Sequence, residues 1–338
     1  MHPSPAPRHR FAVLAALVVA AVTLAACDNV PAAQTTAATP PLVVPAGAHI
    51  VHPSPPTASA TSCGDPTQSI APPATLPTPG AMPSGSYMAE IQARGYLRAG
   101  VDQSTYLWGY RDPVTGALSG FDIDMLRQVS QAIFGSPDRI RYTIVPNADR
   151  VQAVESGEVD IVAETMTINC EREKDVDFSS VYFEAGQQIL VPSNSSITGP
   201  QDLGGKRVCA TDGSTSLNNL VVPPVAPHVT IWAVANETDC LVMLQQGQVD
   251  AISTDNAILE GLAAQDPNTK IVGPTFTQEP YGMAISKAHP DFTSFVNGVL
   301  TNERADGTWA AIYTRWLGAA TAGQPTPAPP VASYRAAS

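Results

Sequence analysis

Two stretches, Glu155-Ser-Gly-Glu-Val-Asp160-Ile and Gln246-Gly-Gln-Val-Asp250-Ala, repeat one pattern at separate places in the chain. In both, a helical segment ends at a glycine and the chain then enters an apolar run through Val-Asp. Glycine readily takes the left-handed conformation with which many helices end. A repeated helix-to-strand unit of this kind indicates two similar α/β lobes rather than one continuous sheet.

Around these stretches, residues 86–318 alternate short apolar runs with helical patterns, which is typical of α/β proteins. The expected strands are Tyr96–Val101, Arg141–Val145, Ile161–Ala163, Gln188–Val191, Arg207–Ala210, Thr230–Trp232, Ala251–Ser253 and Tyr281–Ser286. The expected helices are Asp122–Phe134, Arg150–Ser156, Ser216–Val221, Glu237–Gln246, Asn256–Ala264 and Pro290–Tyr313.

Composition excludes several classes of function. The 338 residues carry a formal net charge of −12, so the basic surface that nucleic acids require is missing, and nucleic acid is not an expected partner. An acidic chain is not attracted to anionic lipid, so membrane attachment needs a segment or a lipid of its own. The chain has no Gly-x-Ser-x-Gly, Gly-x-Gly-x-x-Gly or Cys-x-x-Cys motif, so we expect no enzyme, cofactor or metal site.

The N-terminus predicts export. Basic residues at 8–10 precede an apolar run at 11–21, and Leu24-Ala-Ala-Cys27 follows. This order is typical of a signal peptide, here residues 1–26, and the run is short against the roughly 20 residues that span a bilayer. The last four residues resemble the bacterial lipobox, which implies a lipoprotein that begins at Cys27 and is anchored outside the cell membrane. A transmembrane anchor and ordinary secretion are the alternatives.

Residues 27–85 are rich in Pro, Ala, Thr and Ser, so we expect an extended tether with no core. Residues 319–338 have a similar composition and are expected to form a disordered tail.

A longer run carries a family resemblance. Val159-Asp-Ile-Val-Ala-Glu-Thr-Met-Thr-Ile-Asn-Cys-Glu-Arg172 is similar to the type II periplasmic solute-binding proteins for glutamine, glutamate and aspartate. The same resemblance holds, in the family's order, for Gly120-Phe-Asp-Ile-Asp-Met125, Val176-Asp-Phe-Ser-Ser-Val-Tyr182, Asp202-Leu-Gly-Gly-Lys-Arg-Val208 and Gly307-Thr-Trp309. It implies two α/β lobes joined by two hinge strands, with the ligand in the cleft between them. The implied ranges are 86–188 and 278–318 for the first lobe and 189–277 for the second.

The resemblance also implies which residues hold the ligand. An amino acid carries a carboxylate and an ammonium, so burying it requires an oppositely charged partner for each. Arg172 matches the family's carboxylate-binding arginine, whose planar fork suits this task, and Thr167 and Thr165 match neighbouring contact positions. The alternative for Arg172 is a surface ion pair with Glu171 or Asp175.

The second lobe supplies the other candidates. Asp255 matches the family's ammonium-binding aspartate, and a helix N-cap is its alternative role. Thr215 and Ser216 lie where a helix begins, whose exposed amides suit a carboxylate. Without the resemblance this segment would be only a good helix cap. In the first lobe, Asp102 ends a strand at another contact position, where it would orient an ammonium or a side-chain amide.

The sequence leaves open whether the pocket for the ligand side chain receives a carboxylate or an amide. Asn147-Ala-Asp-Arg150 stands where glutamine binders usually place aromatics, and Arg150 resembles the arginine with which glutamate and aspartate binders receive a side-chain carboxylate. Asp102 replaces a basic residue of those binders, and pairing with Arg150 is an alternative role for it. Arg150 as a solvated helix residue is a further alternative. Glu164 has no family role, and its charge would weaken anionic ligands.

The cysteines predict disulfides. With Cys27 lipidated, four remain, and an even set of four allows three pairings. Cys209 and Cys240 fall in the implied second lobe and Cys170 in the first, which favours 209–240 and leaves Cys63 for Cys170. Each bridge should add roughly 2–4 kcal/mol, and the second would pin the tether to the folded part. Free thiols and zinc ligands are the alternatives.

Together these inferences predict a monomeric, lipid-anchored protein that closes around a polar amino acid and performs no chemistry. It would deliver glutamate, aspartate, glutamine or asparagine to an importer of the ATP-binding-cassette (ABC) type. A sensory subunit that presents occupancy to a transmembrane receptor is the alternative, since both functions use the same closed state.

Overall fold

The computed structural model describes residues 43–52, 63–221, 225–321 and 325–336. The expected signal peptide and Cys27 lie outside the described residues. Within the described ranges, no helix is both long and apolar enough to cross a membrane.

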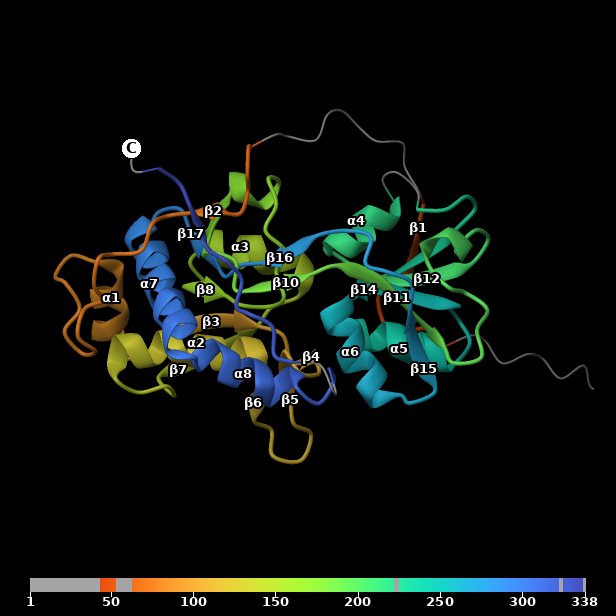
Figure 1. Cartoon of the computed structure of the whole chain (residues 1–338), viewed down its shortest axis with the longest axis horizontal. Coiled ribbons are helices and arrows are strands. Elements are labelled where there is room, and N and C mark those ends of the chain that lie inside the picture. The colour runs from red at the N-terminus through yellow and green to blue at the C-terminus, as the bar shows by residue number, and fades with distance from the viewer. Residues whose placement is uncertain (1–42, 53–62, 222–224, 322–324, 337–338) are drawn as a thin grey trace, which may run out of the picture. The chain divides into compact units, whose positions relative to one another are not determined.

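Two sheets organise the fold, and we name the part built on each a lobe (Figure 1). The sheet of lobe 1 contains β3 (Leu97–Val101), β7 (Ile140–Ile144), β8 (Ile161–Val162), β9 (Val176–Phe178) and β17 (Ala284–Ser286), in the order β7-β3-β8-β17-β9. The sheet of lobe 2 contains β1 (His49–Val51), β11 (Gln187–Pro192), β12 (Arg207–Thr211), β13 (Thr230–Val234), β14 (Ala251–Asp255) and β15 (Thr269–Val272), in the order β1-β13-β12-β14-β11-β15.

Helices pack on both sheets. Those of lobe 1 are α1 (Tyr87–Arg94), α2 (Phe121–Phe134), α3 (Arg150–Glu155), α7 (Pro290–Asp306) and α8 (Thr308–Leu317). Those of lobe 2 are α4 (Thr215–Val221), α5 (Glu237–Gln245) and α6 (Asn256–Gln265). Three single turns of 3-10 helix are η1 (Asn147–Asp149), η2 (Arg172–Lys174) and η3 (Pro200–Asp202).

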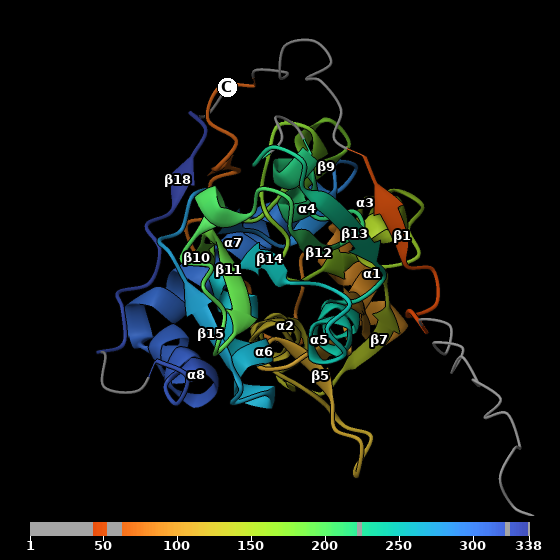
Figure 2. The same cartoon turned by 90° about the vertical axis from the view of Figure 1, so that its right-hand side faces the viewer.

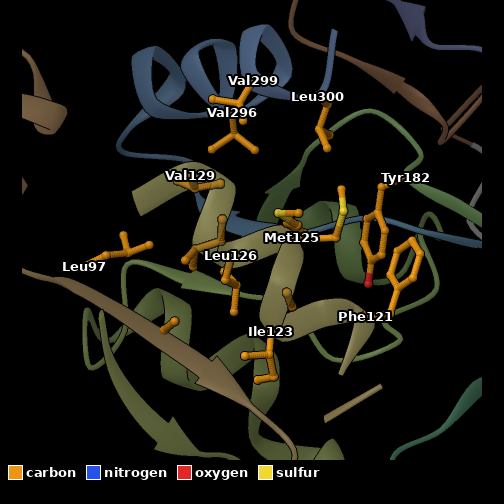
Figure 3. Close-up of a cluster of buried hydrophobic side chains, with 14 of the residues drawn as sticks. Leu97, Phe121, Ile123, Met125, Leu126, Val129, Tyr182, Val296, Val299 and Leu300 are labelled. Atoms are coloured by element: carbon orange, nitrogen blue, oxygen red, sulfur yellow. The ribbon is translucent and has the colours of Figure 1, made fainter. Parts of the chain in front are cut away.

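The core of lobe 1 forms around α2 (Figure 3). Ile123, Leu126 and Val129 are fully buried, between the sheet that contains Leu97 and the face of α7 that contains Val296. Their three-residue spacing, with the four-residue step from Val129 to the buried Ile133, makes one face of α2 apolar, as the helical pattern in the sequence predicts.

Two crossing strands join the lobes. β10 (Phe183–Ala185) pairs antiparallel with β16 (Glu279–Tyr281), and these strands lie between the two sheets in Figure 1. β10 continues into β11 of lobe 2, and β16 returns the chain to β17 of lobe 1. The two expected crossovers are therefore present. Gln187 and Gln188 already pair with β14, so lobe 2 begins two residues earlier than expected.

The repeated Val-Asp pattern has the same structure in both lobes. The Asp160 carboxylate accepts a hydrogen bond from the backbone N–H of Arg98 on β3, at 2.8 Å, and from its guanidinium. The Asp250 carboxylate accepts the equivalent bonds from Arg207 on β12, also at 2.8 Å for the backbone bond. The same pair of aspartate–arginine hydrogen bonds thus fixes the start of a central strand in each lobe. This confirms the two-lobe interpretation of the repeat.

Most expected elements are present, with boundaries shifted by a few residues, but two are divided. The helix expected over Pro290–Tyr313 is α7 and α8, because Gly307 takes a φ of 85° that ends α7. The strand expected over Tyr281–Ser286 is β16 and β17, since the chain passes there from the hinge into the lobe 1 sheet. α1 was not expected, nor was a small sheet made of β4 (Ser104–Thr105), β5 (Gly109–Arg111) and β6 (Leu118–Ser119).

The expectation of an extended tether with no core through residue 85 is wrong for residues 63–85. β2 (Gln68–Ser69) pairs with β18 (Ser333–Tyr334), and Ser69 and Met82 are buried. The buried amide of Asn297 in α7 donates to Ser69 Oγ at 2.8 Å and to the carbonyl of Ile70 at 2.6 Å. Upstream, β1 pairs with β13 at the edge of the lobe 2 sheet (Figure 2).

The expectation of a disordered tail is likewise wrong for residues 325–336, because β18 pairs with β2 and Arg335 donates to the carbonyl of Gln68. Composition alone does not reveal these contacts, since each joins segments that are far apart in the sequence.

Both expected disulfides are present. Cys63 is bonded to Cys170 of lobe 1, and Cys209 to Cys240 within lobe 2. The alternatives of free thiols or zinc ligands are therefore excluded for these four residues.

Candidate ligand-binding site

A cavity lies between the lobes, at the carboxyl ends of parallel strands from both sheets. The free volume left between the lining side chains is about 10 Å³, room for roughly one water molecule. The lining residues are Asn147, Arg150, Thr165, Thr167 and Arg172 of lobe 1 and Ser214, Thr215, Ser216, Glu237, Thr254, Asp255 and Ile258 of lobe 2. Parallel strands carry their following loops to one edge of the sheet, which is where α/β proteins usually bind ligands.

Arg172 is held by the turn η2 on the lobe 1 wall. Its backbone N–H donates to Asn169 Oδ1 at 2.9 Å, and Nη1 donates to the carbonyl of Thr167 at 2.6 Å. Burial and the neighbouring Arg150 lower the pKa of Arg172 to about 9, which leaves the guanidinium charged at neutral pH. A surface ion pair with Glu171 or Asp175 is excluded, because the guanidinium lines the cavity and Glu171 pairs with Lys174 instead.

Asp255 ends β14 on the facing wall. Its buried carboxylate accepts hydrogen bonds from Tyr281 Oη at 2.7 Å and from Ser216 Oγ at 3.2 Å. Burial, and then the nearby Glu279, raise the pKa of Asp255 to about 7. Although Asp255 precedes α6, its side chain makes no capping hydrogen bond, so capping is not its role.

Polar contacts cross the cavity from lobe to lobe. Thr167 Oγ1 lies 3.3 Å from Thr215 Oγ1, and Asn147 Nδ2 donates to Glu237 Oε1 at 2.9 Å. A Cβ atom on Gly213 would lie only 2.5 Å from the Cα atom of Ala148 in the other lobe. The structure is thus a closed form, in which the backbones of the two lobes meet.

Arg150 is buried rather than solvated. Its guanidinium donates to the carbonyls of Asn147 at 2.9 Å and Glu164 at 2.8 Å, and to that of Gly213 at 3.4 Å. These bonds use three of its five N–H groups. Glu164 and Glu237 are buried nearby, and burial is the main cause that raises the pKa of each.

Asp102 differs from the expectation. Its carboxylate accepts hydrogen bonds from the backbone N–H groups of Gln103, at 2.6 Å, and Thr105, at 2.8 Å, and therefore closes its own loop. It does not line the cavity, and the described residues include no ion pair between Asp102 and Arg150. The pairing suggested as an alternative is thus absent.

Thr165 lines the cavity in an unusual conformation. It has a φ of 42°, a left-handed backbone that is uncommon for a threonine. Its backbone N–H donates at 2.9 Å to Asp122, a buried carboxyl that Tyr182 also bonds. The bond to Asp122 holds Thr165 at the cavity wall.

Two acidic residues at or beside the cavity were not expected from the sequence. Glu237 lines the cavity at the start of α5, and Glu279 of β16 accepts a hydrogen bond from Thr215 Oγ1 at 2.8 Å. Glu237 follows β13, a parallel strand beside β12. A search for acidic residues just after the carboxyl ends of parallel strands would therefore have identified it. Glu279 lies on a hinge strand and gave no such signal.

Comparisons with known proteins agree with this geometry. The family model of bacterial extracellular solute-binding proteins, family 3, matches residues 97–319. The ABC transporter glutamine-binding protein GlnH of Bacillus subtilis (strain 168) is 37% identical over 231 residues, which are 68% of this chain and 84% of that protein. The glutamate-binding protein GluB of Corynebacterium glutamicum is 31% identical over 244 residues, covering 69% of this chain and 81% of that protein.

Among solved structures, the solute receptor for L-cysteine of Neisseria gonorrhoeae superposes with a TM-score of 0.67 at 27% identity. The match covers 71% of this chain and 97% of that one.

The family match contains both hinge strands and every residue that lines the cavity. The matched relatives are solute-binding proteins rather than enzymes. With two lobes, two crossing strands and a polar cavity between them, the chain belongs to the bacterial extracellular solute-binding proteins, family 3.

Proposed function

We propose that this protein captures an α-amino acid between its lobes and delivers it to an importer of the ABC type. One observation carries the proposal: a cation and an anion from different lobes, Arg172 and the buried Asp255, line the same cavity. An α-amino acid presents a carboxylate and an ammonium on one carbon, so it can neutralise both walls only when the lobes are closed. Binding and closure are then one event.

The hydroxyl groups around this pair complete the binding of the backbone. Thr167, Thr215 and Ser216 lie between the two charges, and each carries a hydroxyl that can donate or accept. Thr165 adds a fourth hydroxyl at the lobe 1 wall. In this proposal Asp102 acts only by shaping its own loop.

For the ligand side chain we propose a carboxamide, as in glutamine or asparagine. Arg150 supplies N–H donors and Glu237 a carboxylate acceptor, and both line the cavity beside Asn147. An amide presents one carbonyl to a donor and one NH₂ to an acceptor, which suits this pair. A side-chain carboxylate would instead lie against Glu237, a second acidic group in the same buried site, so the two could not readily be ionised together.

We propose further that the protein works as a monomer attached to the outside of the membrane by lipid at Cys27. The matched relatives include the glutamine-binding protein of an ABC transporter, and the sequence around Cys27 has the lipobox order. Replacing Cys27 by Ser should move the protein from the membrane fraction to the soluble fraction. Persistence of the variant in the membrane fraction would exclude the lipid anchor.

The test of the ligand is calorimetry with glutamine, asparagine, glutamate and aspartate, preceded by a thermal-shift screen of all twenty amino acids. A ligand at 100 times its Kd should add about 2.7 kcal/mol and raise the melting temperature by several degrees. Glu237→Gln should remove the preference for amides over acids. Equal selectivity in the variant would show that Glu237 does not read the side chain, and no shift with any amino acid would overturn the function itself.

A further inference from the structure

The two segments outside the lobes pair with each other against lobe 1. β2 and β18 are parallel partners, and the backbone N–H of Arg335 donates to the carbonyl of Ser69 at 2.8 Å. Ser69 in turn donates from Oγ to the carbonyl of Phe178 at 2.6 Å, which fixes the pair of strands to the end of β9 in lobe 1. We call these segments, residues 63–70 and 333–335, the brace.

The brace is bonded to the segment that carries Arg172 at two positions, one before Arg172 and one after it. Cys63 forms the disulfide with Cys170, two residues before Arg172. Arg335 Nη2 donates to Glu173 Oε1 at 2.9 Å, one residue after Arg172, and the same guanidinium lies 3.8 Å from Asp177. The carboxylate of Glu173 is nearly buried, with 11% of its side chain exposed.

The turn is short, and its internal bonds are all local, including those from Arg172 N–H to Asn169 Oδ1 and from Lys174 to Glu171. η2 is a single 3-10 turn, closed by the bonds from Glu173 N to Asn169 O at 3.0 Å and from Asp175 N to Arg172 O at 3.1 Å. Such turns have poorer hydrogen-bond geometry than an α-helix. The guanidinium of Arg172 donates to the backbone carbonyls of Thr167 in lobe 1 and Gly213 in lobe 2. The side chain starts from the turn, so a shift of the turn backbone would move the guanidinium relative to both carbonyls.

We propose that the disulfide Cys63–Cys170 and Arg335 are positioning groups for Arg172, and that the brace thereby sets the affinity for the ligand carboxylate. This inference rests on the proposed function. An arginine that binds a carboxylate through two parallel N–H groups depends on orientation as well as charge. A loosened turn would keep the charge of Arg172 and lose its alignment.

The chain supplies a matched control, since it contains a second disulfide in the other lobe. Cys63→Ser with Cys170→Ser should weaken glutamine binding about tenfold, because a misplaced binding group loses much of its contribution. Cys209→Ser with Cys240→Ser removes the lobe 2 disulfide and should leave the affinity within about twofold of the unmodified protein. Arg335→Ala should weaken binding, and Arg335→Lys should restore part of it through the pair with Glu173.

A readout specific to positioning is the preference for glutamine over its α-carboxamide, measured by calorimetry with the full secreted protein. Loss of alignment should lower this preference in the brace variants, whereas a general loss of stability would weaken both ligands equally. Unchanged affinity and preference in the brace variants would overturn the inference.

A second measurement separates this inference from the proposed function. Hydrogen exchange without ligand should be faster at residues 167–175 in the brace variants and unchanged there in the lobe 2 disulfide variant. If no amino acid binds the unmodified protein, the proposed function fails, and the exchange data still decide whether the brace holds the turn.

Discussion

At the scale of the residue, Arg172 is the group on which binding depends most. Arg172→Ala should weaken amino-acid binding roughly 100- to 1000-fold, because it leaves a buried carboxylate without its cation. Arg172→Lys should bind with intermediate affinity, since it keeps the charge and loses the planar fork.

Calorimetry checks this prediction, and Arg141→Ala is its control. Arg141 is exposed on β7, where its guanidinium lies over the ring of Tyr96, 4.3 Å from the ring centroid. Retained affinity in Arg172→Ala would refute the assignment of the carboxylate site.

Asp255 should make binding depend on pH. Its pKa is raised to about 7 in the free protein, so the carboxyl is largely protonated at pH 5 and ionised at pH 8. A bound ammonium favours the ionised form, so binding must release protons at low pH. Affinity should therefore increase from pH 5 to pH 8, and calorimetry in buffers of different ionisation enthalpy should detect the released proton.

Asp122 provides the control for this measurement. Its pKa is also raised to about 7, but its carboxyl bonds Tyr182 and Thr165 and does not line the cavity. Asp122→Asn should preserve the pH dependence, and Asp255→Asn should remove it along with most of the affinity. An affinity that is constant over this range would contradict the proposed ammonium site.

At the scale of the element, the loop between β12 and α4 determines whether the lobes can close. Gly213 has a φ of 70°, and its missing Cβ leaves room for Ala148 of the other lobe. Gly213→Ala should therefore weaken binding by at least about tenfold, because a contact under 3 Å between heavy atoms is relieved only by opening the cleft.

Gly205 offers a matched control for the backbone cost. It has a φ of 68° and nothing within 4 Å of an added Cβ. Gly205→Ala should therefore lose a similar amount of stability, roughly 1 kcal/mol, without loss of affinity. Calorimetry and small-angle scattering with and without glutamine would check both, and equal effects of the two substitutions would show that Gly213 does not control closure.

At the scale of the whole molecule, the folded unit extends beyond the lobes. A protein that begins at residue 86 should melt roughly 10 °C below one that begins at residue 63, because it loses a disulfide and both partners of the buried Asn297 amide. Calorimetric melting of the two truncated proteins measures this difference. Identical melting temperatures would mean that residues 63–85 add nothing to stability.

The sequence predicts the two lobes better than it predicts the segments at either end of the chain that pack against them. The helix-to-strand repeat around Asp160 and Asp250 predicts the two lobes because each copy is a local pattern. The family resemblance brings Arg172, Thr167 and Asp255 into one cavity, as the structure does. Asn297 and Arg335 could not be assigned in this way, since the partners of their side chains lie more than one hundred residues away. For Asp102, local hydrogen bonds to its own loop replace the expected contact with the cavity.

The disulfide between Cys63 and Cys170 also determines how the molecule carries mechanical load. Tension applied between the N-terminal region and the C-terminus passes from Cys63 directly to Cys170 through a covalent bond. Residues 64–169, which include α1, α2 and the Asn147 and Thr167 walls of the cavity, lie inside the closed covalent loop. Once β18 has separated from β2, their backbone bears none of this tension. The short pairings of β1 with β13 and of β18 with β2 lie outside this covalent path, so we expect pulling to separate these strands before the lobes unfold. A protein held to a surface by its N-terminus could thus be stretched while much of its ligand-binding lobe stays unstrained.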